Sequence, residues 1–401
     1  MAKLSQLHEE KMPSPAEIVS RDFKPTIFNR IQEEISKRSG GGNAPLALHV
    51  GDTWFDLPPE LQKPLANEPW NERLSRYGDT QGELELRKHL AKKVREKNGL
   101  PVEDERQIQV TFGATGGLFL AMRRLMEPGS EVLVLSPYWT IFRMVAATAG
   151  VQVVEVPFFD RITPDTTSDE IEALLAPFLT ENTRTLYFNN PNNPSGVLLR
   201  QPQIEALASF ALKHDLWVLS DEAYEDFIWT GDECVSIGSL PGMFERTISI
   251  YTFSKSYAMA GLRLGYIAAS NGAIATINPG HVGVGYEPPR YVQVQAIRGL
   301  ENRDRIIPRL YRAYLEGRQS ALENIQLPTL TSEGSFFLFV DLRERWAGLD
   351  DDGKLVRMLD AGVVLSPGAA FGKEYEGWGR FCFTTEKPEL IAEAARRVNH
   401  L

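Results

Sequence analysis

Lys255 lies among hydroxyl side chains, eight positions before an arginine and directly after a predicted strand. Residues 252–266 read TFSKSYAMAGLRLGY. A lysine becomes a nucleophile toward carbonyl groups when burial or neighbouring cations lower its pKa. Thr252, Ser254 and Arg263 can hold an anion beside it. This combination fits an aldehyde cofactor that carries a phosphate, such as pyridoxal 5′-phosphate, but an S-K-S triplet alone is a weak motif.

Three more segments that can contact such a cofactor follow predicted strands. Residues 113–117 (GATGG) open a predicted helix at 118–126, whose N-terminus favours an anion; an ordinary β–α turn is the alternative. Trp139, in SPYW, can stack on a planar ring, although burial in the core explains a single tryptophan better. Residues 190–196 (NPNNPSG) form a turn that two prolines restrict, and one X–Pro bond can be cis.

Asp221 and Tyr224 form a fourth segment, DEAY, after the run 216–219. A carboxylate at this position can pair with a pyridine nitrogen and keep it protonated, which lets the ring stabilise a carbanion. Tyr224 can donate to the phenolate oxygen of the ring. Taken alone, Asp221 is better explained as a helix N-cap.

The elements that must position these side chains follow an alternating pattern. Between about residues 107 and 270, short β-rich runs alternate with helical patterns, and several runs are apolar on both faces. Such alternation predicts right-handed βαβ units and a doubly wound, mostly parallel sheet with ligands at the carboxyl ends of its strands. The predicted strands are Gln107–Phe112, Glu131–Leu135, Val151–Val156, Arg184–Phe188, Leu216–Leu219, Thr247–Thr252 and Leu264–Ala269.

The two ends of the chain have different patterns, which predict a smaller α+β domain. Residues 1–51 are expected to form an N-terminal arm and part of this domain, residues 52–299 the large cofactor domain, and residues 300–401 the rest of the small domain. Helices are predicted at Pro25–Lys37, Arg303–Asn324 and Pro388–Asn399, and strands at Ser335–Leu342, Gly362–Leu365 and Phe381–Phe383. Asp350–Gly353 lacks the spacing of a calcium loop and is expected to be a solvated turn.

Composition narrows the class of protein. The 401 residues are 43% hydrophobic and 24% charged, with a net charge of −10, which disfavours nucleic acid and anionic membranes as partners. No apolar run is long enough to span a bilayer, and the polar N-terminus does not resemble a signal peptide. Two isolated cysteines fit a reducing compartment, so we expect a cytoplasmic protein. The six histidines show no ligand spacing, and we assign no metal site.

The motifs together closely resemble the class I/II aminotransferases, which are fold-type I pyridoxal phosphate enzymes with an aspartate aminotransferase-like fold. The matching segments occur in family order over nearly the whole chain. They are VGDTWFDLP, RYGDTQGELELR, GATGGL, SPYW, NPNNPSG, DEAY, SKSYAMAGLRLGY, GSFFLFVDL and GRFCFT.

The resemblance implies a role for each matched residue. Lys255 is the lysine that forms the Schiff base and shuttles the α-proton, and Asp221 is the partner of the pyridine nitrogen. Asn193 and Tyr224 contact the ring phenolate oxygen, and Trp139 stacks on the ring. Arg380 binds the substrate α-carboxylate, with Asn193 and the Gly51 N–H beside it. The phosphate is held by Ala114, Thr115, Thr252, Ser254 and Arg263, and by Tyr77 of a neighbouring subunit, which implies a homodimer with shared active sites.

Some segments depart from the family pattern. Asp52-Thr53-Trp54 replaces the usual acidic-Pro-acidic run, and residues 285–291 (GYEPPRY) replace a loop of small residues. Within that loop, Glu287 and Arg290 are interpreted as a surface pair rather than as substrate contacts. Trp54, Tyr138 and Trp139 suggest a pocket for a flat or long apolar side chain. Glu9 and Glu10, in the N-terminal arm, leave a basic substrate open.

These features predict a pyridoxal phosphate-dependent aminotransferase that moves an amino group from an L-α-amino acid to a 2-oxo acid. The alternative is a relative with the same fold that carries out β/γ-elimination, replacement or side-chain cyclisation, which the unusual segments at 52–54 and 286–291 keep open. A non-enzymatic regulator is disfavoured because the first fifty residues are too few and not basic enough for a DNA-binding domain. A nucleotide-binding protein is disfavoured because the chain has no G-x-x-x-x-G-K-[ST] motif.

Overall fold

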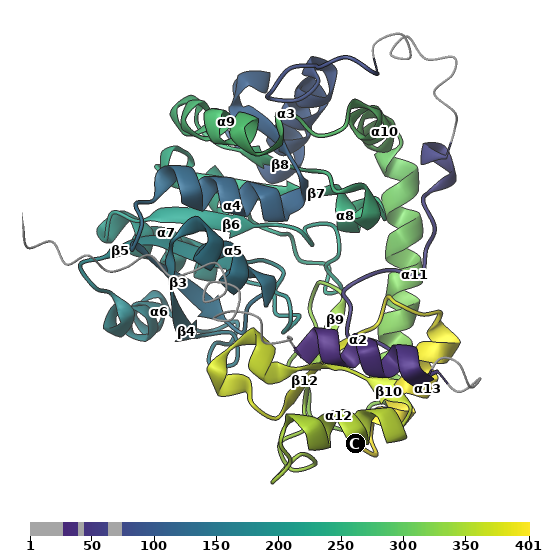
Figure 1. Cartoon of the computed structure of the whole chain (residues 1–401). Coiled ribbons are helices and arrows are strands. Elements are labelled where there is room, and N and C mark those ends of the chain that lie inside the picture. The colour runs from purple at the N-terminus through teal and green to yellow at the C-terminus, as the bar shows by residue number, and fades with distance from the viewer. Residues whose placement is uncertain (1–26, 39–43, 63–73) are drawn as a thin grey trace, which may run out of the picture.

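The centre of the molecule is a seven-stranded sheet with strand order β2-β8-β7-β6-β5-β3-β4 (Figure 1). The computed structural model describes residues 27–38, 44–62 and 74–401. β8 runs antiparallel to β2 and β7, and the other neighbours pair in parallel. All seven predicted strands are therefore confirmed, as is the α/β class. The strands are β2 (Ile108–Thr111), β3 (Glu131–Ser136), β4 (Gln152–Pro157), β5 (Thr183–Asn189), β6 (Trp217–Asp221), β7 (Thr247–Thr252) and β8 (Gly265–Ala268).

Successive residues of a strand point to opposite faces of the sheet, and in these strands the residues on both faces are apolar. Helices therefore cover both faces. Val132 and Val134 pack into a core with α4, α5 and α9, whereas Leu133 and Leu135 pack into a second core with α6 and α7. Both cores hold the parallel strands in place and leave their carboxyl ends free for a site. The helices are α4 (Gly113–Leu125), α5 (Ile141–Ala149), α6 (Ser168–Leu175), α7 (Gln201–Lys213) and α9 (Asn271–Gly285).

Segments from both ends of the chain form a second, smaller α+β part below the sheet in Figure 1. β1 (Leu46–Ala47) pairs in parallel with β10 (Val363–Val364), and Ile31 and Leu48 pack into one core with residues beyond 320. A three-stranded antiparallel sheet, in the order β11-β12-β9, completes this part. Its other elements are α2 (Ile27–Arg38), β9 (Phe337–Asp341), α12 (Asp351–Asp360), β11 (Ser366–Pro367), β12 (Trp378–Cys382) and α13 (Pro388–Val398).

The long helix α11 (Arg303–Asn324) joins the two parts and has the bounds predicted from the sequence. Leu310 and Tyr314 pack into a core that also contains residues of α3 (Leu84–Asn98) and α10 (Arg290–Glu301), whereas Ala321 belongs to the core of the chain ends. Figure 1 shows α11 running from α10 down to the lower part. The division at residues 52 and 300 stays a prediction.

Some local predictions were wrong. The strand predicted at Phe381–Phe383 begins three residues earlier, so that Arg380 lies within β12. Asp350–Gly353 is the N-terminus of α12 rather than a solvated turn, because the Asp350 carboxylate accepts the N–H of Gly353 at 2.8 Å. Within the described residues, no helix has the length and apolar character needed to cross a membrane.

Candidate active site

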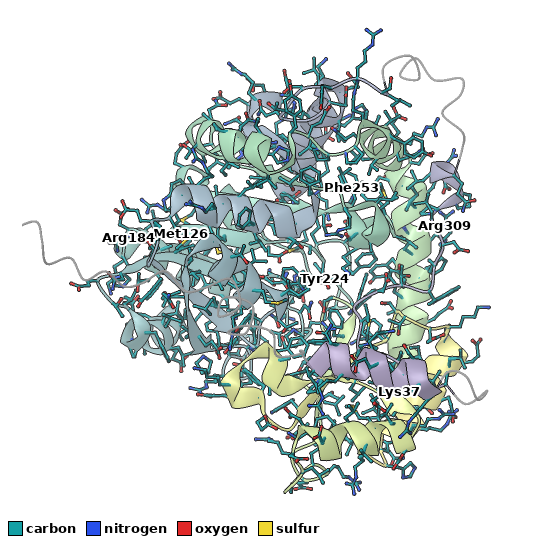
Figure 2. The ribbon with its side chains drawn as sticks, viewed as in Figure 1. Lys37, Met126, Arg184, Tyr224, Phe253 and Arg309 are labelled. Carbon is teal, nitrogen blue, oxygen red and sulfur yellow. The ribbon has the colours of Figure 1, made fainter. Side chains whose placement is uncertain are left out.

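A cavity of about 770 Å³ opens where the carboxyl ends of β5, β6 and β7 meet the part formed by the chain ends. This is the expected position for a ligand of an open α/β sheet. Tyr224, one of its lining residues, lies near the middle of the molecule in Figure 2. The predicted site residues that line the cavity are Gly51, Ala114, Thr115, Trp139, Asn193, Asp221, Tyr224, Thr252, Ser254, Lys255, Arg263 and Arg380. Tyr77 does not line it.

Lys255 lies on the short helix α8 (Phe253–Ser256), which begins directly after β7. Thr252 caps this helix, because its Oγ1 accepts the N–H of Ser254 at 3.1 Å. The Lys255 amine donates to the Gly51 carbonyl oxygen at 2.5 Å. This hydrogen bond joins two lining residues of the cavity that are 204 positions apart in the sequence. Burial lowers the pKa of Lys255, which raises the fraction of the neutral, nucleophilic amine.

Asp221 is the last residue of β6 and is buried at the floor of the cavity. Its carboxylate accepts the hydroxyl of Tyr187 and the N–H of Ala223, both at 3.1 Å. Burial raises the pKa of Asp221 to about 6 in spite of these donors. The helix-cap alternative is wrong, because the residues after Asp221 form turns and no helix. A cationic N–H partner would stabilise this buried carboxylate.

Two glycines allow an anion site at the N-terminus of α4. A Cβ atom at Gly265 would lie 2.6 Å from the carbonyl carbon of Gly113 and 2.7 Å from the nitrogen of Ala114, so β8 approaches this helix end closely. A Cβ at Gly113 would lie 2.7 Å from Nη2 of Arg263. The guanidinium of Arg263 and the helix N-terminus therefore face the same space, which favours a bound phosphate or other anion.

The side chain of Arg380 extends from β12 to the turn after β5, where it contacts Asn193. Its Nη1 donates to Oδ1 of Asn193 at 2.8 Å, and its Nη2 donates to the His49 carbonyl oxygen at 2.7 Å. The guanidinium carbon lies 4.4 Å and 4.8 Å from the ring centroids of Phe337 and Phe371. These contacts fix the plane of the guanidinium, so it can bind a carboxylate in one orientation. The Asn193 amide also donates to the Tyr224 hydroxyl at 3.4 Å.

Comparison with known proteins assigns the family. The sequence profile of the aminotransferase class I and II family matches residues 45–398. The chain belongs to this family. It is 33% identical to an aromatic-amino-acid aminotransferase of Thermococcus litoralis, over 88% of this chain and 90% of that protein. It is 32% identical to an aspartate aminotransferase of Pyrococcus abyssi, over the same shares.

A solved structure agrees with this family assignment. The chain superposes on an aspartate aminotransferase of Thermus thermophilus with a TM-score of 0.84 and 27% identity, over 95% of this chain and 97% of that one. The protein is therefore an aminotransferase with an aspartate aminotransferase-like fold. Because the relatives carry different substrate names, the substrate of this aminotransferase must be argued from its own side chains.

Of the three aromatic residues expected in the pocket wall of this aminotransferase, only Trp139 lines the cavity. Trp54 stacks on Phe55, with ring centroids 4.1 Å apart, and does not line the cavity. Tyr138 is buried and donates to Glu155 at 3.0 Å. Sequence reasoning missed an apolar part of the wall, for which the helical spacing of Ile141 and Met144 after Trp139 was the available signal. The missed apolar residues are Ile27, Phe28, Ile141, Met144, Ala369 and Ala370.

The segment after α9 does not line the cavity of the aminotransferase. Arg290 pairs with Glu83 and is only 10% exposed, so its interpretation as half of a surface pair was wrong. Glu287 accepts the N–H of Gly78. Both contacts tie the segment to the residues just before α3. Glu9 and Glu10 lie outside the described residues, so their relation to the cavity stays a prediction.

Proposed function

We propose that this aminotransferase uses pyridoxal phosphate to move an amino group from an L-α-amino acid to a 2-oxo acid. What supports the proposal most is the convergence of three groups on one cavity, namely the Lys255 amine, the Asp221 carboxylate and the Arg380 guanidinium. These groups come from β12 and from the residues at the ends of β6 and β7. Together they match an aldehyde, a pyridine nitrogen and a carboxylate.

The donor set fits the cofactor. Lys255 would hold its aldehyde, Asp221 its protonated pyridine nitrogen, and Asn193 and Tyr224 its phenolate oxygen. The phosphate would lie against Ala114, Thr115, Thr252, Ser254 and Arg263, at the N-terminus of α4, where the first backbone N–H groups of a helix favour an anion. Trp139 would cover the ring. When bound, pyridoxal phosphate supplies the electron sink that stabilises negative charge at the substrate α-carbon.

The chain's own residues then orient the substrate and move its proton. Arg380 binds the α-carboxylate in the plane fixed by Phe337 and Phe371, with the Gly51 N–H beside it. This orientation presents the α-hydrogen to Lys255, whose Nζ removes the proton and later returns it on the cofactor side. The lowered pKa of Lys255 suits this exchange, because a neutral amine is needed to accept the proton.

The active unit is a homodimer in this proposal. Tyr77 is 84% exposed and contacts Tyr286 with ring centroids 4.8 Å apart. An exposed tyrosine outside its own chain's cavity is free to reach the phosphate of a neighbouring subunit. The two free cysteines, Cys234 and Cys382, agree with a reducing, cytoplasmic location.

A pair of half-reactions tests the proposal. The purified enzyme, loaded with pyridoxal phosphate, is mixed with single L-amino acids in the absence of any 2-oxo acid, and the cofactor absorption is followed. We expect one equivalent of 2-oxo acid per site and conversion of the cofactor to its amine form, which a 2-oxo acid then reverses. Continuous turnover without a 2-oxo acid would favour elimination or cyclisation instead. Part of the support for that alternative is gone, because residues 286–291 do not line the cavity.

A further inference from the structure

The cations that line the cavity in the described part of the chain are four, and each already has a partner or a proposed ligand. They are Lys255, Arg263, Arg380 and Arg143. The first three would bind cofactor and α-carboxylate. Arg143 donates its Nη2 to Glu155 and its Nε to the Tyr138 hydroxyl, the latter at 3.0 Å. Its charge is therefore compensated by a neighbouring carboxylate.

Of the acidic side chains that line the cavity in the described part of the chain, one has no such partner. Asp221 would face the pyridine nitrogen, whereas Asp52 forms no ion pair with any described residue. Oδ1 of Asp52 accepts only the N–H of the next residue, Thr53, at 2.9 Å. The exposed side chain of Asp52 lies at the cavity, close enough to Lys255 to influence its pKa. Among the described residues of one subunit, a carboxylate on a substrate side chain would thus meet the Asp52 carboxylate and no cation that lacks a partner or a proposed ligand.

Another part of the cavity lining is apolar. Ile27 and Phe28 come from the first turn of α2, and Ile141 and Met144 come from the first turn of α5. Ile141 and Met144 are 38% and 53% exposed, so part of their apolar surface is open to a ligand in the cavity that they line. A ligand that covers them would remove their surface from water, with a gain of about 25 cal/mol for each Å² buried.

We propose that this wall binds a neutral, apolar substrate side chain, such as that of methionine, leucine or phenylalanine, and that the cavity rejects acidic amino acids. The inference rests on the proposed function, because it assigns Arg263 and Arg380 to the cofactor phosphate and the α-carboxylate.

The half-reaction rates of the holoenzyme test this inference. The second-order rate constant for conversion of the bound cofactor is measured with L-methionine, L-leucine, L-phenylalanine, L-aspartate, L-glutamate and L-lysine. We expect the best apolar amino acid to exceed aspartate and glutamate by roughly 100-fold. A faster reaction with an acidic amino acid, or with lysine, would overturn the inference and leave the proposed function intact. No reaction with any of the six would overturn both.

A charge placed in the apolar wall gives a second readout. Met144→Arg puts an uncommitted cation there, and we expect the ratio of the rate constant for glutamate to that for methionine to rise at least about tenfold. Leu212→Lys adds the same charge on α7, where Leu212 is exposed and does not line the cavity, and should leave the ratio unchanged. Met144→Gln serves as a neutral polar variant and should lower the methionine rate without raising the glutamate rate. An unchanged ratio in Met144→Arg that still binds cofactor would contradict the inference.

Discussion

At the scale of single residues, the buried carboxylate of Asp221 is suited to bind a cation. Burial raises the pKa of Asp221 to about 6, even though Tyr187 and the Ala223 N–H both donate to it. A buried charge that only neutral groups satisfy is costly, and a protonated pyridine nitrogen would remove much of that cost. The proposed interaction therefore links the chemistry of the cofactor to the stability of its site.

Asp221→Asn should weaken cofactor binding and nearly abolish transamination, because the amide cannot hold the pyridine nitrogen protonated. We expect a loss of roughly 10²–10³-fold in the half-reaction rate, equivalent to a broken buried charge pair of about 3–4 kcal/mol.

In the native protein, the cofactor dissociation constant should rise as the pH falls through about 6, since Asp221 must then lose a proton before it can bind the cation. Above that pH, the contribution of Asp221 is constant.

Equilibrium titrations with pyridoxal phosphate between pH 5 and 8 measure this dependence. The Asn variant is the control, because any pH dependence that it keeps belongs to the cofactor or to other groups. Equal slopes in the two proteins would contradict the role proposed for Asp221.

Residue type at the end of a strand was enough to select several of the residues that line the cavity. Lys255, Asp221 and Asn193 are polar residues that follow apolar strands, and a doubly wound sheet must bring such positions together. The same reasoning failed for Trp54 and Tyr138. Aromatic rings pack equally well in a core and in a pocket wall, and only tertiary contacts decide which one they enter.

At the scale of elements, the close contact between β8 and α4 shapes the N-terminus of α4, where we propose that the phosphate binds. Gly265 lets the strand lie against the first residues of the helix, with its Cβ position 2.6 Å from the backbone of Gly113. Since a real Cβ cannot occupy that space, any other residue must displace the helix N-terminus.

Gly265→Ala should therefore weaken pyridoxal phosphate binding and destabilise the fold by about 1–3 kcal/mol. Gly261→Ala is a matched control, because no atom lies within 4 Å of its Cβ position, and it should change both quantities little. Urea unfolding of the cofactor-free proteins gives the stability, and cofactor titration gives the affinity. Equal behaviour of the two variants would show that the close approach does not shape the site.

The pattern of elements was predictable to different degrees. Seven strands were found because the strands of a sheet that helices cover on both sides carry apolar residues on both faces. The contribution of α2 to the cavity was not predicted, because Ile27 and Phe28 reach it only through packing of the N-terminal segment on elements more than 300 residues later. Sequence periodicity describes one helix face and carries no information about its partner.

At the scale of the whole molecule, the proposed dimer predicts that two subunits share each site. Tyr77→Phe removes a hydroxyl that we propose to bind the phosphate of the neighbouring subunit. Cofactor affinity should fall roughly 10–100-fold, the effect of one hydrogen bond to a charged group. Tyr291→Phe, at another exposed tyrosine, should have no such effect.

Hybrid dimers distinguish a shared site from a separate one. In a dimer of one Tyr77→Phe subunit and one Lys255→Ala subunit, the intact lysine belongs to the first subunit and the intact tyrosine to the second. We expect the single functional site of this hybrid to recover native cofactor affinity. If the hybrid binds as weakly as the Tyr77→Phe homodimer, Tyr77 does not serve the neighbouring subunit.

The attachment of the cofactor to Lys255 is the central claim, and chemical trapping measures it directly. The holoenzyme is reduced with borohydride, digested, and analysed by mass spectrometry for a lysine that carries the reduced cofactor. We predict one modified site, in the peptide that contains Lys255, and no modification in Lys255→Ala. Modification of a different lysine in the native protein, or no stable adduct at all, would contradict the account.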